Sequence, residues 1–157
     1  AQLRSLDAGK GEKIPLLSEV LDTVNRRAMV NIELKGPRTA IPVLALLREY
    51  IAAGWSPQDF IVSSFRRLEL GQLRGSGLRV GVLFARSARR FRPIATRLGA
   101  WSVHVPLAHV NPRLVARIHD DGRKVFVYTV NTRAAMERLD AMGVDGFFTD
   151  FPDRWTA

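Results

Sequence analysis

The feature that most constrains the fold is a regular alternation of short extended segments with helical patterns. Apolar residues recur at helical spacing between the extended segments, as at Ile41, Leu44, Leu47 and Ile51. Repeated alternation of this kind predicts parallel strands joined by right-handed helical crossovers. Six segments rich in Val, Ile and Phe are predicted as the strands: 29–35, 60–65, 79–85, 101–107, 124–131 and 146–151.

The number of strands suggests which α/β fold is present. A (β/α)8 TIM barrel uses about 250 residues for eight units, or about 30 residues per unit. Six strands in 157 residues therefore predict an incomplete TIM (β/α)8 barrel with about six of its eight strands. The segment 33–40, ELKGPRTA, contains neither GxGxxG nor GxxxxGK[ST], which argues against a Rossmann or P-loop fold. We expect one domain over residues 1–157, because no linker is long enough to divide the chain.

Composition limits the partners and the compartment. The net charge is +9, and the densest basic patch, Arg86 to Pro93, is interpreted as a solvated helix face. The other arginines are scattered without interleaved aromatic residues, so we expect no nucleic-acid partner. No apolar run approaches the roughly 20 residues of a transmembrane helix, so we expect no transmembrane segment. The chain has no cysteine, and although nothing fixes the compartment, a cytoplasmic location is favoured.

The first predicted strand carries an unusual row of polar side chains. Asn31, Glu33 and Lys35 share one face of the segment MVNIELK, because side chains alternate along a strand. A strand inside a parallel sheet is covered on both faces and should be almost continuously apolar. We therefore expect these side chains to point into the mouth of the barrel, although a structural ion pair of Glu33 and Lys35 is an open alternative.

Polar residues also end the later strands, where barrel enzymes place their catalytic groups. Several of these residues have simpler explanations: His104 as a core histidine, His109 and His119 as loop and helix-surface residues, and Asp150 as a turn residue. No Ser-His-Asp order and no HExxH spacing is present. The remaining candidates at the strand ends are Ser63, Ser64, Tyr128, Thr129, Asn131 and Thr149, with hydrogen bonding to nearby backbone as the simpler alternative for the two serines.

Four segments, in order along the chain, resemble the glycerophosphodiester phosphodiesterase family. They are IPLLSEVLD, VNIELKGP, FIVSSF and VFVYTVNTRAAMERLDAMGVDGFFTDFPD. The resemblance implies a TIM barrel that hydrolyses small-molecule glycerophosphodiesters to glycerol 3-phosphate and an alcohol, in lipid and glycerol metabolism. It also implies a divalent metal, Ca²⁺ or Mg²⁺, held by carboxylates.

The resemblance assigns roles to individual residues. Glu33 matches a metal ligand, and Lys35 matches a lysine at the phosphate site. Hard cations prefer oxygen ligands, and a lysine can neutralise a phosphate, so the chemistry agrees. Tyr128 replaces the tryptophan usual in the family, which keeps an aromatic wall and adds a hydroxyl. The implied substrate-binding residues are Lys35, Ser64, Phe65, Tyr128 and Asn131.

The family's acid–base histidines are not found in the sequence. There is no HRG motif and no matching Glu-x-Asp pair before Met29, so we expect the first two barrel strands to be absent. The chain would then be the C-terminal three quarters of the barrel, inactive alone, with open edges that favour oligomers or aggregates. Two alternatives stay open: a related phospholipase D-type lipid phosphodiesterase, and a non-catalytic barrel remnant that binds an anionic ligand or a partner.

Overall fold

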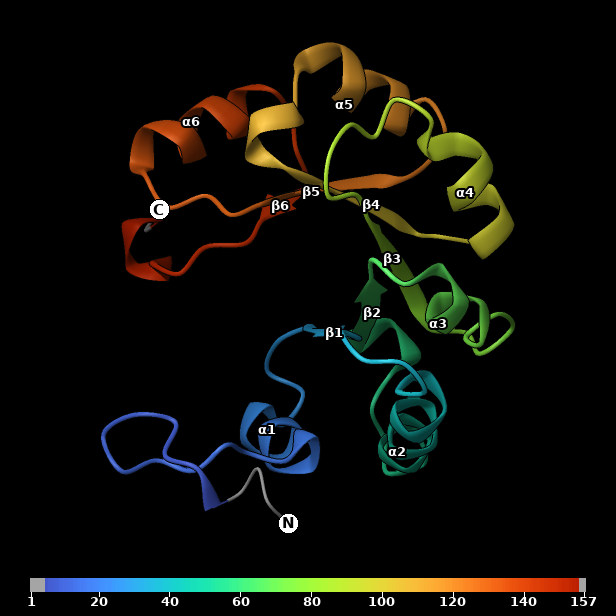
Figure 1. Cartoon of the computed structure of the whole chain (residues 1–157), viewed down its shortest axis with the longest axis vertical. Helices are drawn as coiled ribbons and strands as arrows, with labels where there is room; N and C mark the ends of the chain where they lie inside the picture. Colours follow the sequence, from blue (N-terminus) through green and yellow to red (C-terminus); the bar gives the residue numbers. More distant parts are fainter. Residues whose placement is uncertain (1–4, 156–157) are drawn as a thin grey trace.

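The computed structural model describes residues 5–155 and contains a six-stranded, entirely parallel sheet. The strands are adjacent in chain order, so each pairs with the strand before it and the strand after it. Figure 1 shows them forming an arc, which is part of a barrel wall. The strands are Val30–Glu33 (β1), Phe60–Ser64 (β2), Arg79–Leu83 (β3), Ser102–Pro106 (β4), Lys124–Tyr128 (β5) and Gly146–Phe147 (β6).

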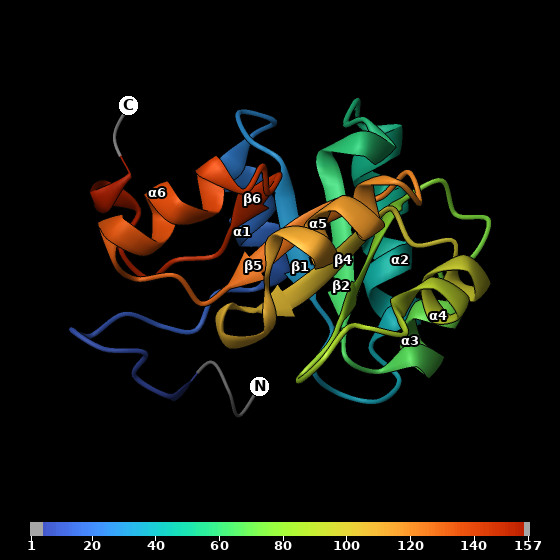
Figure 2. The same ribbon diagram turned by 90° about the horizontal axis from the view of Figure 1, so that it is seen from above.

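Helices cover the outer, convex side of this arc (Figures 1 and 2). They are Leu17–Val24 (α1), Ala40–Ala52 (α2), Arg67–Gly71 (α3), Phe91–Leu98 (α4), Pro112–His119 (α5) and Arg133–Ala141 (α6). Short 3-10 turns lie at Pro57–Asp59, Leu107–His109 and Pro152–Arg154. Because a helix links each strand to the next, the predicted α/β fold and incomplete (β/α)8 barrel are confirmed.

The two faces of the sheet differ in chemistry. Val62, Val82, Val103 and Val125 are fully buried in the core between the sheet and the helices. The alternate residues of the same strands face the concave side, which carries polar and aromatic groups as well as apolar ones. The polar row predicted for the first strand is therefore explained in part, because Asn31 lies on the concave side with Glu33.

Several predicted boundaries differ from the observed ones. β1 ends at Glu33, so Lys35 lies in the connection to α2, and β6 contains only Gly146–Phe147. The interpretation of the basic patch as a helix face is wrong for most of its arginines. Helix α4 begins at Phe91, so Arg86, Arg89 and Arg90 precede it in the connection from β3.

A buried carboxylate fixes the connection between β1 and α2. Glu69 of α3, only 8% exposed, accepts hydrogen bonds from the backbone N–H groups of Arg38, Thr39 and Ala40 at 2.7, 2.9 and 2.9 Å. These donors are otherwise unpaired at the start of a helix, and the helix dipole favours an anion there. The hydrogen bonds from Ala40 and Arg38 lower the pKa of the Glu69 carboxyl. Glu69 thus ties the loop that carries Lys35 to the following βα unit.

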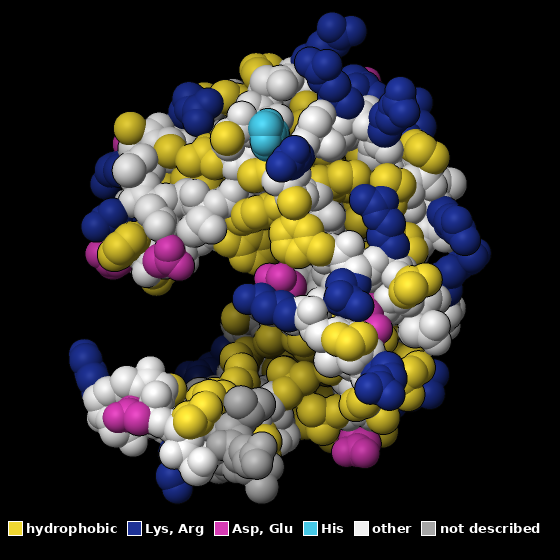
Figure 3. All heavy atoms as spheres, in the orientation of Figure 1, with side chains coloured by type: hydrophobic (Ala, Val, Ile, Leu, Met, Phe, Trp, Pro, Cys, Tyr) yellow, Lys and Arg dark blue, Asp and Glu magenta, His cyan; other side chains and the backbone are white. Residues whose placement is uncertain are grey.

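The outermost strands are open on one side within residues 5–155. β1 pairs only with β2, and β6 pairs only with β5. The space-filling view in Figure 3 shows a wide opening between the lower and upper arms of the molecule. None of the helices in this part of the chain is long and apolar enough to cross a bilayer.

We predict that Glu69→Gln lowers the melting temperature at pH 7, because an amide nitrogen would face backbone donors in place of a carboxylate oxygen. The folded-state pKa lies below the ordinary value of 4.5, so the stabilisation by Glu69 is present above pH 4.5 and is lost as the pH falls through the folded-state pKa. The difference between wild type and variant should therefore shrink in acid. Thermal melts from neutral to acid pH measure it. Glu137→Gln, at an exposed pair with Arg133, is the matched control, and an unchanged melt of Glu69→Gln at pH 7 would contradict the assignment.

Candidate active site at the carboxyl ends of the strands

A cavity of about 180 Å³ lies on the concave face, at the carboxyl ends of the strands. All six strands, or the residues directly after them, contribute to its wall. Barrel enzymes carry their catalytic groups at this end of the strands. The lining residues are Asn31, Glu33, Ser63, Phe65, Leu83, His104, Tyr128, Thr129 and Phe148.

Glu33 is the one carboxylate in this lining. It is the last residue of β1 and lies in register with Ser63 of β2. Burial raises the pKa of Tyr128, and the negative charge of Glu33 raises it further. The carboxylate and the phenol therefore share one electrostatic environment at the cavity.

Three buried polar atoms at this cavity have no hydrogen-bond partner in the described part of the chain. They are Oδ1 of Asn31, Oγ of Ser63 and Nδ1 of His104. No other buried side-chain nitrogen or oxygen among residues 5–155 lacks a partner. Buried polar groups are almost always paired, so three residues of one cavity wall are left with polar atoms that residues 5–155 do not satisfy.

His104 is held in the core as a neutral ring. It is fully buried, and burial lowers its pKa to about 4. Its Nε2 atom lies 2.9 Å from Oγ of Ser102, and its buried Nδ1 atom has no partner within residues 5–155. Gly81 provides the space for the ring, because a Cβ atom at that position would lie 2.7 Å from Nε2 of His104. The sequence-based interpretation as a core histidine agrees with this burial, although the ring also lines the cavity and its Nδ1 atom is not satisfied within residues 5–155.

Aromatic side chains form the outer wall of the cavity. The rings of Phe65 and Tyr128 meet edge to face with centroids 6.0 Å apart. The Tyr128 hydroxyl donates a hydrogen bond to the carbonyl oxygen of Phe84 at 2.6 Å. The hydroxyl that distinguishes this tyrosine from a tryptophan is therefore engaged by the backbone, and the ring provides the wall.

Three of the predicted site residues lie outside this lining. Lys35 is exposed in the connection after β1. Ser64 is buried, donates to the carbonyl oxygen of Leu34 at 2.6 Å and accepts from the backbone N–H of Arg66 at 2.9 Å. Asn131 bridges to Asp150, with its Nδ2 atom 2.8 Å from Oδ2 and its Oδ1 atom 3.0 Å from the backbone nitrogen. The bridge agrees with the interpretation of Asp150 as a turn residue.

The unpaired hydroxyl in the cavity belongs to Ser63, not to its neighbour Ser64. Consecutive residues of a strand point to opposite faces, so only one serine of the pair can face the cavity. The signal in the sequence is the alternation with Phe60 and Val62, which are buried with the helices. This alternation did not identify the buried face in the sequence, because Ile61, on the concave face, is as apolar as Phe60 and Val62.

The described residues do not by themselves complete a metal site. No three His, Cys, Asp or Glu side chains come together within residues 5–155 in an arrangement that could hold an ion. Glu33 provides one carboxylate, and the oxygens of Asn31 and Ser63 are neutral donors in the same cavity. Calcium takes six to eight oxygen ligands, and magnesium requires octahedral coordination, so this set is too small to hold either ion alone.

The cavity lies at the end of the strands where TIM-barrel enzymes carry their active sites. Comparison with known proteins identifies the family. The profile of the glycerophosphoryl diester phosphodiesterase family matches residues 1–154, and the chain belongs to this family. The resemblance seen in the sequence is thereby confirmed.

Individual relatives agree with the family assignment. The chain is 30% identical to the glycerophosphodiester phosphodiesterase of Caldanaerobacter subterraneus over 97% of its length and 67% of that protein. It is 32% identical to the enzyme of Bacillus altitudinis, covering 90% of the chain and 60% of that protein. The fold resembles that of a phosphodiesterase from Oleispira antarctica in complex with the product sn-glycerol-3-phosphate, with a TM-score of 0.82 at 24% identity, covering 98% of this chain and 67% of that one. The chain thus spans roughly two thirds of the length of these relatives.

We predict that His104 makes the fold sensitive to mild acid. Its pKa falls from 6.5 to about 4 on folding, so below pH 6.5 the unfolded chain binds a proton that the folded chain does not, and stability decreases. Between pH 6.5 and about pH 5, this linkage should remove about 1.5 kcal/mol from the free energy of unfolding.

Denaturant unfolding across this pH range measures the loss. His104→Gln should flatten the pH dependence, whereas His109→Gln, at an exposed position, should leave it unchanged. If His104→Gln does not fold, the NMR titration of the His104 ring in the wild type gives the same answer. A ring that titrates near pH 6.5 would contradict the prediction.

Proposed function

We propose that the protein carrying this chain hydrolyses glycerophosphodiesters to glycerol 3-phosphate and an alcohol. The observation that carries the proposal is the cavity in which Asn31, Ser63 and His104 each present an unpaired buried polar atom beside Glu33. The family supports the reaction class, and the product bound to the Oleispira antarctica protein is the product expected for this chain.

The cavity suits the glycerol part of such a substrate. Glycerol hydroxyls both donate and accept hydrogen bonds. The Asn31 oxygen accepts, the Ser63 hydroxyl does either, and Nδ1 of the neutral His104 does one or the other according to its tautomer. Each pairing would satisfy an atom that is costly to bury alone. These three side chains would therefore orient the glycerol.

The phosphodiester would lie at the exposed edge of the cavity. Lys35 lies two residues after the end of β1 and is exposed, so its flexible ammonium can approach a phosphate oxygen there. The net charge of +9 favours the approach of an anionic substrate. Phe65 and Tyr128 offer an aromatic surface to the leaving alcohol.

The proposal also gives Glu33 a role as a ligand of Ca²⁺ or Mg²⁺. Its support is the family resemblance and the position of Glu33 as the one carboxylate at the cavity. The other ligands would have to come from outside residues 5–155, because this part of the chain brings no second carboxylate to the cavity. A divalent cation bound at such a site stabilises negative charge on phosphoryl oxygens.

We predict that Glu33→Gln in the complete protein lowers kcat/KM for glycerophosphocholine by about 10² or more, the size of effect that a positioned charged group commonly has. The fold should be intact, because Glu33 is exposed at the end of its strand. Hydrolysis is measured across a titration of calcium and of magnesium. Glu49→Gln, at an exposed helix position, is the control and should behave as wild type. Normal turnover by Glu33→Gln at every metal concentration would remove Glu33 from the site.

We predict that residues 1–157 as an isolated chain do not hydrolyse glycerophosphodiesters and do self-associate. Positioned acid–base groups typically contribute about 10²–10⁴ in rate, and the family's histidine pair has no match in this sequence. The free edges of β1 and β6 carry unpaired backbone groups that favour pairing with another copy. Light scattering and a phosphodiesterase assay on chain of verified mass test both statements. A monomer with metal-dependent turnover would contradict them.

A further inference from the structure

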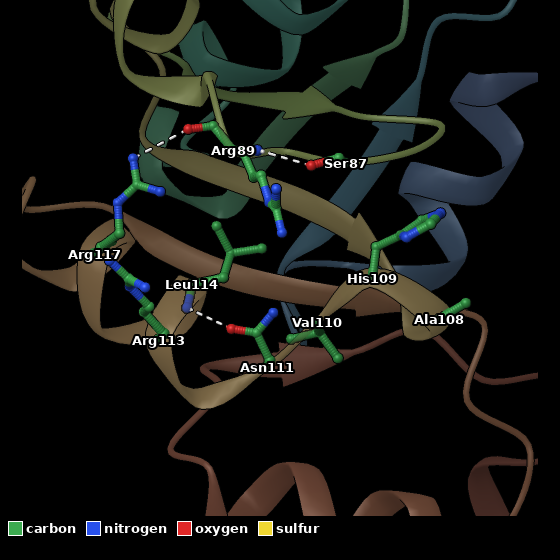
Figure 4. A pocket seen from close by; sticks show the side chains of 9 residues that line it. All are labelled: Ser87, Arg89, Ala108, His109, Val110, Asn111, Arg113, Leu114 and Arg117. Carbon is green, nitrogen blue, oxygen red and sulfur yellow. Dashed lines mark hydrogen bonds between the residues drawn. The ribbon is translucent and has the colours of Figure 1, made fainter.

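A second, larger cavity lies outside the sheet, between the β3–α4 connection and the start of α5 (Figure 4). Its volume is about 610 Å³, within the range of about 300–1,000 Å³ that is usual for small-molecule sites. It shares no lining residue with the cavity that contains Glu33. The two cavities are therefore separate.

Positive charge dominates this second cavity. Arg89, Arg113 and Arg117 line it, and no Asp or Glu does. None of the three guanidinium groups forms an ion pair within residues 5–155, although other arginines of the chain do. Unneutralised charges of one sign repel each other and do not stabilise a fold, so three of them in the wall of one cavity favour an anionic ligand.

One of the three arginines, Arg117, is held in place by contacts within the protein. Nη2 of Arg117 donates to the carbonyl oxygen of Arg89 at 3.0 Å, and the Arg117 guanidinium lies 5.9 Å from the centre of the Phe91 ring. These contacts join α5 to the β3–α4 connection. Figure 4 shows the Arg89 side chain extending from that connection toward the first turn of α5. Arg89 and Arg113, by contrast, have exposed side chains that are free to close on a ligand.

The side-chain amide of Asn111 adds a neutral hydrogen-bond donor to the three arginines of the second cavity. Asn111 caps α5 by accepting the Leu114 backbone N–H at its Oδ1 atom, at 3.0 Å. The cap fixes the orientation of the side-chain amide, whose Nδ2 atom forms no hydrogen bond to residues 5–155. An oriented amide donor in the same cavity as three guanidinium groups is suited to an oxyanion, because an oxyanion accepts several directed hydrogen bonds.

The position of the second cavity makes it independent of the open edges of the sheet. All its residues lie between Ser87 and Arg117, around β4, which has a strand on each side. In Figure 1, α4 and α5 lie away from the opening between the arms. The described residues that line this pocket therefore include none from the open edges and none from the cavity that contains Glu33.

We propose that this second cavity is a binding site for a phosphate monoester group, either of a soluble ester or of a lipid headgroup. Guanidinium groups match phosphate oxygens in pairs, and a dianion can use several arginines at once. The cavity is also larger than a phosphate alone requires, so there is room for the group that the ester carries.

The test uses two probes and a pair of matched variants. Phenyl phosphate represents a soluble monoester, and phosphatidic acid in phosphatidylcholine vesicles represents a lipid one. Isothermal titration and vesicle sedimentation at low ionic strength compare wild type with Arg89→Gln/Arg113→Gln. The control is Arg48→Gln/Arg138→Gln, which removes the same charge at exposed positions outside the pocket. Vesicles with phosphatidylglycerol at equal charge separate monoester recognition from surface charge.

We expect wild type and control to bind phenyl phosphate, phosphatidic acid vesicles, or both, and the Arg89→Gln/Arg113→Gln variant to bind about 10-fold more weakly, as expected for the loss of charge-assisted hydrogen bonds. Which probe binds more tightly identifies the source of the phosphate. Equal loss in the control variant, equal binding to phosphatidylglycerol vesicles, or no binding of either probe by the wild type would overturn the proposal. Circular dichroism of each variant verifies the fold.

Discussion

The strict alternation of side chains along a parallel ladder is the constraint on which the rest of this structure depends. Every strand must bury one set of residues against the helices and present the other set to the concave side. Val62, Val82, Val103 and Val125 satisfy the first requirement and form a continuous core. Asn31, Ser63 and His104 are the consequence of the second, because strand register brings them to one cavity. The stability of the fold and the chemistry of its site are therefore set by the same backbone pairing.

Connections between the units add precision at the ends of the strands. Glu69 accepts three backbone hydrogen bonds at the start of α2 and so fixes the loop that carries Lys35. Asn131 and Asp150 bridge the ends of two later segments in the same manner. A carboxylate at a helix N-terminus and an amide across two loops each satisfy backbone donors that would otherwise be unpaired. Glu69 and Asn131 therefore both fix the position of a loop at the carboxyl ends of the strands.

The distribution of arginine separates two kinds of surface. Arg92 and Arg123 both pair with Asp121, and Arg133 pairs with Glu137, so these groups belong to the ordinary network of surface ion pairs. Arg89 and Arg113 have no such partner in residues 5–155 and line the same cavity. Net charge alone could not distinguish these situations, because it counts each arginine equally. What distinguishes them is whether the fold places a carboxylate nearby.

The sequence by itself determined the order of strands and helices, the α/β class and the incomplete barrel, because periodicity and residue type are local properties of the chain. It also placed Glu33, Phe65 and Tyr128 near the strand ends, where the structure finds them in the cavity. Only the tertiary structure decided which of Ser63 and Ser64 lines the cavity, because the residues before them are apolar on both faces of the strand. Ser63 is in register with Glu33 of β1, and the Ser64 hydroxyl bonds to the backbone of Leu34. The tertiary structure alone brought Arg89 and Arg113 to one cavity and paired Asn131 with Asp150, since these residues lie about 20 or more positions apart in the chain and their proximity follows from how helices and loops pack on the sheet.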